Sequence, residues 1–148
     1  MAEDGGKSLG CGWGGMVRYA ARRGVHAIGV TLSKEQASWA QAEIEKQGLG
    51  EFAEVRLQDY RDVPEGQFDA ISSIGITEHI GRDNYSSYFE KLRSLLKPGG
   101  LLLNHSITRP ENSRTTKAGA FIDRYIFPDG ELAGPSIISA EAENAGFE

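Results

Sequence analysis

Apolar residues recur along the chain in two alternating patterns, one typical of β-strands and the other typical of amphipathic α-helices. Short apolar or alternating runs predict strands at residues 26–31, 52–57, 68–74 and 101–105. Apolar positions spaced as on one face of a helix predict helices over 16–23, from Ser33 to Gly48, over 85–96, and in shorter form over 121–127 and 139–145. Strands that alternate with helices predict an α/β fold with a doubly wound, mostly parallel sheet.

The two ends of the chain fit this pattern less well. Residues 7–9 are the only candidate for a first strand, and Leu9 is its single apolar residue, which is thin support for a central buried strand. We therefore expect residues 1–8 to be a disordered leader or a remnant of cloning, and residues 9–148 to form one incomplete core domain. The last residues stop where such folds usually continue to a further strand, which predicts truncation at both ends.

Composition narrows the class of protein. The chain has 148 residues, 39% of them hydrophobic, and a net charge of -5, which argues against a nucleic-acid partner held by bulk charge. Cys11 is the only cysteine, so neither an internal disulfide nor a cysteine-rich zinc site can form. No apolar run approaches the roughly 20 residues of a membrane span, and the first residues do not resemble a signal peptide. These features predict a cytoplasmic location.

The densest chemical signal is a glycine-rich turn before the first helix. Gly10, Gly12, Gly14 and Gly15 allow positive φ and close approach of a ligand to the backbone, which suits a nucleotide-like ligand. The dinucleotide fingerprint also requires an acid about 20 residues further on, and none occurs at 30–33, so NAD is disfavoured. The Walker pattern fails as well, because no Lys-Ser or Lys-Thr follows the glycines.

Several further motifs occur in a fixed order. They are Gly-Cys-Gly-Trp-Gly-Gly (10–15), Gly-Val-Thr-Leu-Ser-Lys-Glu-Gln (29–36), Leu-Gln-Asp-Tyr-Arg-Asp (57–62), Gly-Ile-Thr-Glu-His-Ile-Gly (75–81), Leu-Lys-Pro-Gly-Gly (96–100) and Asn-His-Ser-Ile (104–107). With these motifs, residues 9–148 resemble the cyclopropane-fatty-acyl-phospholipid synthases and mycolic acid cyclopropane synthases. That family consists of class I methyltransferases that depend on S-adenosylmethionine (SAM), with a Rossmann-like fold.

The resemblance implies a SAM site at the carboxyl ends of the strands. The implied contacts are Gly10, Gly12 and Gly14 for the methionine part, Thr31 and Gln36 for the ribose and adenosine, Asp59, Tyr60 and Arg61 beside the adenine, and Ile74 at the closing edge of the pocket. Ser8 stands where the family carries an acid that helps to fix the cofactor's amine. Its loss implies weaker binding, by roughly 1.5–3 kcal/mol.

The resemblance also implies the reaction. A methyl group moves from SAM to a cis double bond of an unsaturated phospholipid acyl chain, and loss of a proton closes a cyclopropane ring. Glu78 and His105 are implied as catalytic residues that hold a bicarbonate, which takes the proton. Contact with the inner membrane surface is implied to be peripheral and transient, and Tyr125 and Phe127 are implied to border the acyl chain.

Simpler interpretations of these residues stay open. Glu78 can cap a helix, His105 can be a buried core histidine, and Cys11 can be a small residue in a tight turn rather than a nucleophile. The three histidines share no metal-binding spacing. Two other functions remain as alternatives: a SAM-dependent methyltransferase with another lipid or small-molecule acceptor, and an inactive SAM-binding fragment. The sequence leaves the oligomeric state open.

Overall fold

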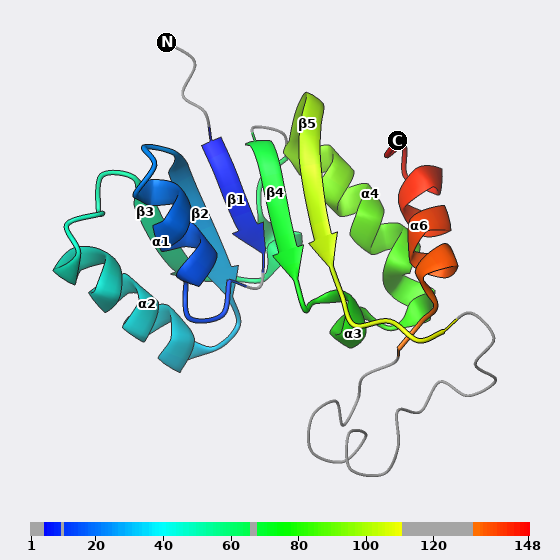
Figure 1. The fold of residues 1–148 in the computed structure, drawn as a ribbon, viewed down its shortest axis with the longest axis horizontal. Coiled ribbons are helices and arrows are strands. Elements are labelled where there is room, and N and C mark those ends of the chain that lie inside the picture. Colours follow the sequence, from blue (N-terminus) through cyan, green and yellow to red (C-terminus); the bar gives the residue numbers. More distant parts are fainter. Residues whose placement is uncertain (1–4, 10, 66–67, 111–131) are drawn as a thin grey trace. The chain divides into compact units, whose positions relative to one another are not determined.

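A computed structural model describes residues 5–9, 11–65, 68–110 and 132–148, with side chains from Cys11 onward. In this part of the chain, five strands form one sheet in the order β3-β2-β1-β4-β5 (Figure 1). The strands are β1 (Gly5–Leu9), β2 (His26–Thr31), β3 (Ala53–Leu57), β4 (Phe68–Ile74) and β5 (Leu96–His105). The pairs β1–β2, β1–β4 and β2–β3 are parallel, which confirms the predicted α/β fold.

Strand β1 corrects the expectation of a disordered leader over residues 1–8. The strand begins at Gly5 and lies in the middle of the sheet, where Gly6 is in register with Ala27 on β2 and with Ala70 on β4. Its backbone pairs on both sides, and this pairing does not depend on apolar side chains. The pattern of apolar residues therefore gave only a weak signal for this strand. Residues 1–4 lie outside the described part of the chain.

The helices follow the strands as expected, with some changes at their ends. They are α1 (Gly15–Ala21), α2 (Lys34–Lys46), α3 (Thr77–Ile80), α4 (Tyr85–Leu95) and α6 (Pro135–Asn144), with short 3-10 turns η1 (Tyr60–Asp62) and η2 (Arg82–Asn84). Ser33 caps α2 and accepts a hydrogen bond from the Gln36 N–H at 3.2 Å, as the sequence predicted. The helix expected at 121–127 lies outside the described residues.

Two boundaries differ from the predicted ones. Strand β5 begins at Leu96, directly after α4, rather than at residue 101. Pro98 disfavours helical geometry at the residue before it, so the chain becomes extended at once. Helix α6 begins at Pro135 rather than at residue 139, since proline is well suited to the first turn of a helix.

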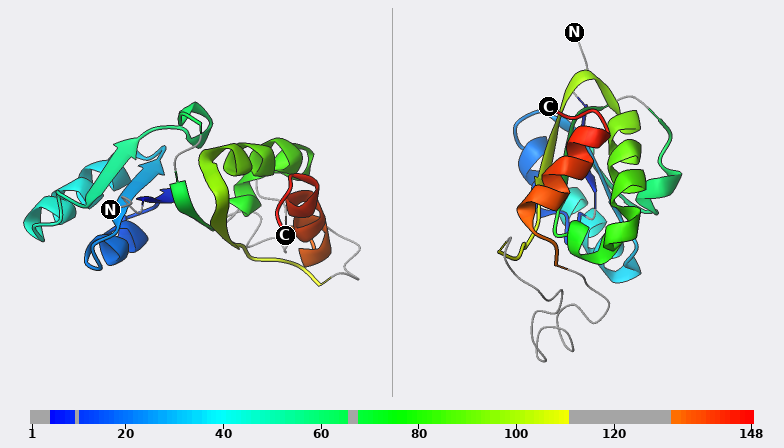
Figure 2. Two further views of the ribbon diagram at one scale, coloured as in Figure 1. Left: turned by 90° about the horizontal axis from the view of Figure 1, so that it is seen from above. Right: turned by 90° about the vertical axis from the view of Figure 1, so that its right-hand side faces the viewer.

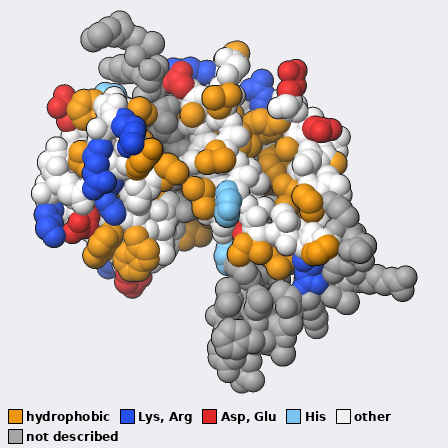
Figure 3. All heavy atoms as spheres, in the orientation of Figure 1, with side chains coloured by type: hydrophobic (Ala, Val, Ile, Leu, Met, Phe, Trp, Pro, Cys, Tyr) orange, Lys and Arg blue, Asp and Glu red, His pale blue; other side chains and the backbone are white. Residues whose placement is uncertain are grey.

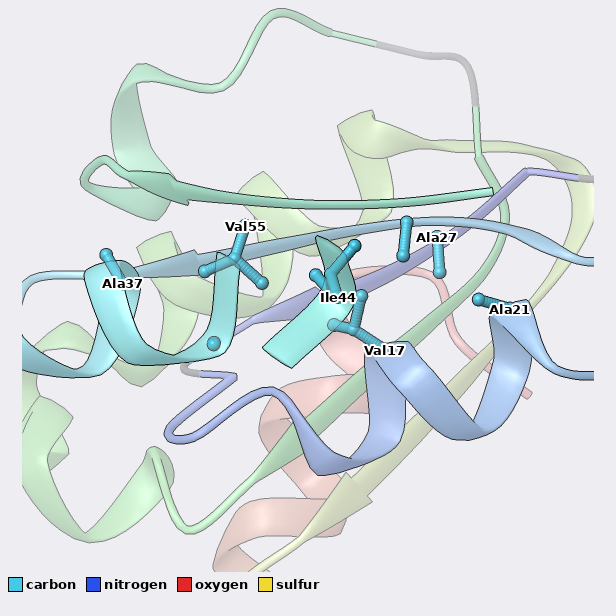
Figure 4. Close-up of a cluster of buried hydrophobic side chains, with 8 residues drawn as sticks. Val17, Ala21, Ala27, Ala37, Ile44 and Val55 are labelled. Carbon is cyan, nitrogen blue, oxygen red and sulfur yellow. The ribbon is translucent and has the colours of Figure 1, made fainter. Parts of the chain in front are cut away.

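The chain divides into two compact units rather than the single domain expected. Unit 1 comprises residues 1–74 and 94–104, and unit 2 comprises residues 75–93 and 105–148. In unit 1, α1 and α2 bury one apolar cluster with β2 and β3 (Figure 4), formed by Val17, Ala21, Ala27, Ala37, Ala40, Ile44, Ala53 and Val55. This cluster fixes both helices against the strands whose ends carry the predicted cofactor residues.

Unit 2 is built around the apolar face of α4. Tyr85, Tyr88, Phe89 and Leu92 are almost completely buried there. Helix α6 lies alongside α4 (Figure 2), and the ring of Phe89 meets that of Phe147, just after α6, at 6.3 Å between centroids. No helix among the described residues is both long and apolar enough to cross a membrane.

Candidate functional site

The glycine-rich turn connects β1 to α1 in unit 1. The Cys11 N–H donates to the Val30 carbonyl at 2.9 Å, and the Gly14 N–H donates to the Cys11 carbonyl at 2.8 Å. Gly12 and Gly14 have φ values of 52° and 72°, in the left-handed region that favours glycine. The turn thus has the tight geometry that the sequence predicted, while Gly10 lies outside the described residues.

The two described glycines of the SAM prediction serve different physical needs. A Cβ on Gly14 would lie 2.9 Å from the Cβ of Ala40, so glycine is required here for α1 to pack against α2. A Cβ on Gly12 would meet no atom within 4 Å. Of these two glycines, Gly12 is therefore the one that borders open space of the kind that a ligand can enter.

Cys11 is packed into the sheet rather than presented to a substrate. A Cβ on Gly29 of β2 would lie 2.8 Å from both the Cβ and the Sγ of Cys11, so the thiol fills the space that a glycine in the strand leaves. Burial raises the pKa of the Cys11 thiol from 9.0 to about 11. This supports the interpretation of Cys11 as a packing residue. Sequence reasoning missed Gly29, although an isolated glycine in a strand often marks such a close approach.

Thr31 and Gln36 are brought together at the carboxyl end of β2. The Thr31 hydroxyl donates to Gln36 Oε1 at 2.8 Å and accepts from the Ser33 N–H at 3.2 Å. Thr31 is buried and Gln36 is half-buried. The threonine hydroxyl is thus engaged with the protein, and it fixes the orientation of the glutamine amide.

The three residues predicted beside the adenine lie at η1, after β3: Asp59 is its N-cap, and Tyr60 and Arg61 are its first two residues. The Gln58 N–H donates to the Thr31 carbonyl at 3.0 Å, which ties this loop to the end of β2. The Asp59 carboxylate accepts bonds from its neighbour Arg61, at 3.0 Å from Nε, 2.7 Å from Nη2 and 2.9 Å from the backbone N–H. These bonds lower the pKa of Asp59. Burial raises the pKa of the half-buried Tyr60.

Ile74 ends strand β4 and is 41% exposed. Leu32 follows β2 and Leu57 ends β3, and both are also exposed. Because the three strands are parallel, their carboxyl ends lie at one edge of the sheet. This edge of unit 1 thus combines exposed apolar side chains with the Thr31–Gln36 pair, as expected of a cofactor site in an open α/β sheet.

Glu78 lies in unit 2, in the short helix α3, and its side chain is almost completely buried at 2% exposure. Its Oε1 accepts a hydrogen bond from the Ile107 N–H at 2.7 Å. Its Oε2 is buried and has no hydrogen-bond partner in the described part of the chain. The carboxylate bonds outside its own helix, and α3 has no side-chain cap, so the interpretation of Glu78 as a helix cap is wrong.

His105, at the end of β5, is exposed, so the interpretation of it as a core histidine is wrong. Its backbone carbonyl accepts from the Gly75 N–H at 2.9 Å. Within the residues described, its imidazole makes no hydrogen bond to Glu78. The structure instead brings the Ile107 backbone to the carboxylate, and no sequence signal could have indicated this, because every residue but proline carries such a group.

Tyr125 and Phe127, the residues expected beside the acyl chain, lie outside the described part of the chain. The remaining predicted residues fall into two groups. Gly12, Thr31, Gln36, Asp59 and Ile74 belong to unit 1 with their neighbours, and Glu78 and His105 belong to unit 2. The polar side chains of the first group bond to one another. In the second group His105 is exposed, and the buried Glu78 carboxylate keeps one oxygen without a partner in the described part of the chain.

Comparison with known proteins identifies the family. The model of the family described as mycolic acid cyclopropane synthetase matches residues 4–148. The chain belongs to this family. Among family relatives, a probable fatty acid methyltransferase of Mycobacterium tuberculosis is 61% identical over 140 residues, which cover 95% of this chain. The cyclopropane-fatty-acyl-phospholipid synthase of Escherichia coli K12 is 40% identical over 136 residues, or 91% of this chain.

Solved structures of cyclopropane synthases share the fold. The cyclopropane synthase MmaA2 from M. tuberculosis matches 97% of this chain with a TM-score of 0.86 and 29% identity. The mycolic acid cyclopropane synthase CmaA1, complexed with SAH and CTAB, matches 97% with a TM-score of 0.85 and 29% identity. The fold is that of class I SAM-dependent methyltransferases. The chain spans 33% and 34% of the two curated relatives and 54% of each structure.

Proposed function

We propose that this chain carries the catalytic core of a cyclopropane synthase. The proposed reaction transfers a methyl group from SAM to the cis double bond of an unsaturated phospholipid acyl chain, at the cytoplasmic face of the inner membrane. Support comes from the family match and from the 40% identity to an enzyme named for a fatty-acyl-phospholipid substrate.

The buried carboxylate of Glu78 is the observation that carries this proposal. An ionised carboxylate only accepts hydrogen bonds, so a partner for its free Oε2 must donate one. A buried acceptor without a partner costs about 1–3 kcal/mol, so the protein gains stability when a donor arrives. Bicarbonate is a small oxyanion that carries an O–H, and it fits this requirement. A simple methyl transfer to oxygen or nitrogen needs no such group.

The residues predicted to face SAM fit the proposed cofactor as well. Gly12 leaves open space at the glycine-rich turn, and Gln36 retains two N–H donors on its Nε2 after Oε1 is bound by Thr31. We propose Gln36 as the residue that contacts the ribose or adenosine, with Thr31 as the residue that positions it. Asp59, Tyr60, Arg61 and Ile74 would line the adenine side, and the paired Asp59–Arg61 would contribute shape more than charge.

When bound, SAM supplies an electrophilic methyl group and bicarbonate supplies a base. The protein's own contribution is to orient the bound groups and to exclude water from them. Glu78 is held by the Ile107 N–H, so its free oxygen has a fixed direction, and its burial keeps water from that position. His105 stays a candidate for the second ligand, since it is two residues from Ile107 and its imidazole can donate a hydrogen bond.

Two measurements test the proposal. Calorimetric titration with S-adenosylhomocysteine should show binding; the absence of heat at millimolar ligand would favour an inactive domain. Incubation with SAM and unsaturated phospholipid vesicles should give acyl chains heavier by one CH₂ unit. Proton NMR of the product should then show ring protons at high field, and a product without them would contradict ring closure.

A second candidate has an observation of its own. The 61% identical relative is named a probable fatty acid methyltransferase, so a different acyl acceptor, or a methyl or methylene branch in place of a ring, is the alternative. Parallel incubations with free fatty acids and with phospholipids separate these acceptors. The same NMR spectrum separates a ring from a branch.

A further inference from the structure

The surface of α1 and α2 in unit 1 carries an unusual group of exposed side chains. Four large apolar residues there are between 38% and 53% exposed. We define the α1–α2 patch as these four residues together with three neighbouring arginines: Trp13, Met16, Tyr19, Trp39, Arg18, Arg22 and Arg23. Figure 3 shows Lys and Arg side chains in a row over α1, with hydrophobic side chains beside them.

The aromatic rings are ordered on this surface by direct contacts. Trp13 and Trp39 meet edge to face, with 5.5 Å between ring centroids. Arg18 lies over the Trp39 ring at 5.2 Å and donates to the Trp13 carbonyl at 2.6 Å. In the turn just after α1, Arg23 lies over the Tyr19 ring at 3.6 Å. The patch is therefore a built surface of stacked cations and rings rather than scattered exposed residues.

The charge around the patch is opposite to that of the whole chain. The net charge is -5, yet no Asp or Glu occurs between residues 5 and 34. On α2, Glu35 and Glu43 lie one turn to either side of Trp39, and Glu43 accepts hydrogen bonds from Lys46 and Gln47, which lower its pKa. An anionic surface would thus attract this face and repel much of the remaining surface, which gives a preferred orientation.

We propose that the α1–α2 patch docks the protein on the surface of an anionic phospholipid bilayer. The proposal rests on the proposed function, since a phospholipid acyl substrate lies in a bilayer. Trp and Tyr rings favour the level of the lipid headgroups, and arginine binds phosphate through paired hydrogen bonds. A nucleic acid fits less well, because the chain as a whole is acidic and three arginines give a small footprint.

Tryptophan fluorescence gives a direct test, because Trp13 and Trp39 are the only two tryptophans of the chain and both belong to the patch. Vesicles of phosphatidylglycerol and phosphatidylcholine should shift the emission to the blue and sediment the protein. Vesicles of phosphatidylcholine alone, or added high salt, should largely abolish both effects. The variant Arg22→Gln/Arg23→Gln should partition into anionic vesicles roughly twentyfold more weakly.

A matched control removes two charges elsewhere. Arg56 follows Val55, whose side chain lies in the cluster beneath α1 and α2, so Arg56 points to the opposite face of the sheet, and Arg82 belongs to unit 2. The variant Arg56→Gln/Arg82→Gln should bind vesicles like the parent. Equal weakening by both variants, binding without a blue shift, or binding to an oligonucleotide but not to vesicles would overturn the proposal.

Activity assays separate this proposal from the proposed function. On substrate dispersed in detergent, the Arg22→Gln/Arg23→Gln variant should keep the parent's activity, and on anionic vesicles it should lose most of it. Loss of activity in detergent as well would contradict a docking role. A parent protein that binds vesicles through the patch but methylates no lipid in either assay would refute the proposed function alone.

Discussion

Asp59, which precedes η1 in unit 1, and Glu78, in α3 of unit 2, are carboxylates in opposite situations. Asp59 is partly exposed, and both of its oxygens bond to Arg61, two residues away. Glu78 is buried, with one oxygen bonded to a backbone N–H and the other unpartnered in the described chain. A satisfied carboxylate on the surface maintains local structure, whereas a buried, incompletely satisfied one indicates a place for a ligand.

The same contrast holds for the two groups of predicted site residues. Around Thr31 the polar groups of unit 1 bond to one another, so this edge is complete without a ligand and offers only the remaining donors of Gln36. In unit 2 the hydrogen bonding of the buried Glu78 carboxylate is complete only when a further donor is present. The cofactor region should therefore tolerate substitutions that keep its internal bonds, and Glu78 should not.

The largest expected effect is on catalysis by the Glu78→Gln variant. Its amide oxygen can still accept from Ile107, but the side chain no longer offers an ionised acceptor, so the methylation rate should fall by roughly 10²–10⁴. Thermal unfolding should show a stability within about 1 kcal/mol of the parent, because a buried charge is removed. Glu90→Gln, on the exposed face of α4, is the control. Lost stability with intact catalysis would make Glu78 merely structural.

The reactivity of Cys11 should show how closed the glycine-rich turn is. Since burial raises the thiol pKa to about 11, its thiolate fraction at neutral pH should be roughly a hundredfold below that of an ordinary cysteine. Alkylation by iodoacetamide, followed by mass spectrometry, should be slow at pH 7 and accelerate as the pH rises towards 11. Unfolding in urea should remove the protection. Rapid alkylation of the folded protein at neutral pH would contradict the packed position.

The Thr31→Val variant tests whether the threonine positions Gln36. It keeps the shape but removes the hydroxyl that donates to Gln36 and accepts from Ser33. We expect about tenfold weaker binding of S-adenosylhomocysteine, the equivalent of about one hydrogen bond, measured by calorimetry. Thr31→Ser retains the hydroxyl and should bind nearly as the parent does. Unchanged affinity in the valine variant would exclude a positioning role.

The smallest effect is expected for Asp59→Asn. Arg61 lowers the folded pKa of Asp59 below 3.8, so the stabilisation is complete above that pH and disappears as the pH falls through the lowered value. The pair is exposed to solvent, so the loss at pH 7 should be less than about 1 kcal/mol by urea unfolding. Below the folded pKa, the variant and the parent should be equally stable. A difference that persists in acid would point to a cause other than this charge.

The α/β fold class could be predicted from the sequence, because the periodicities of helices and strands depend on residues that are close together in the chain. The predicted helix at 85–96 matches α4, and the Ser33 cap of α2 was read from a single hydroxyl and its spacing to Gln36. Strand β1 could not be predicted well, because two neighbouring strands supply its hydrogen bonds and its own side chains give little signal. The start of β5 was missed for a related reason, as proline and glycines there resemble a loop.

The residue types of the candidate site were determined by sequence alone: the glycines of the turn, Thr31 and Gln36, which are predicted to take the place of an acid, and the motif around Glu78. Only the tertiary structure decided their roles. Gly14 is required by Ala40, Cys11 fills the space above Gly29, and Glu78 bonds to a backbone N–H 29 residues away. Burial and pairing depend on segments distant in the chain, so sequence could name the chemical groups while the fold determined which of them is left without a partner.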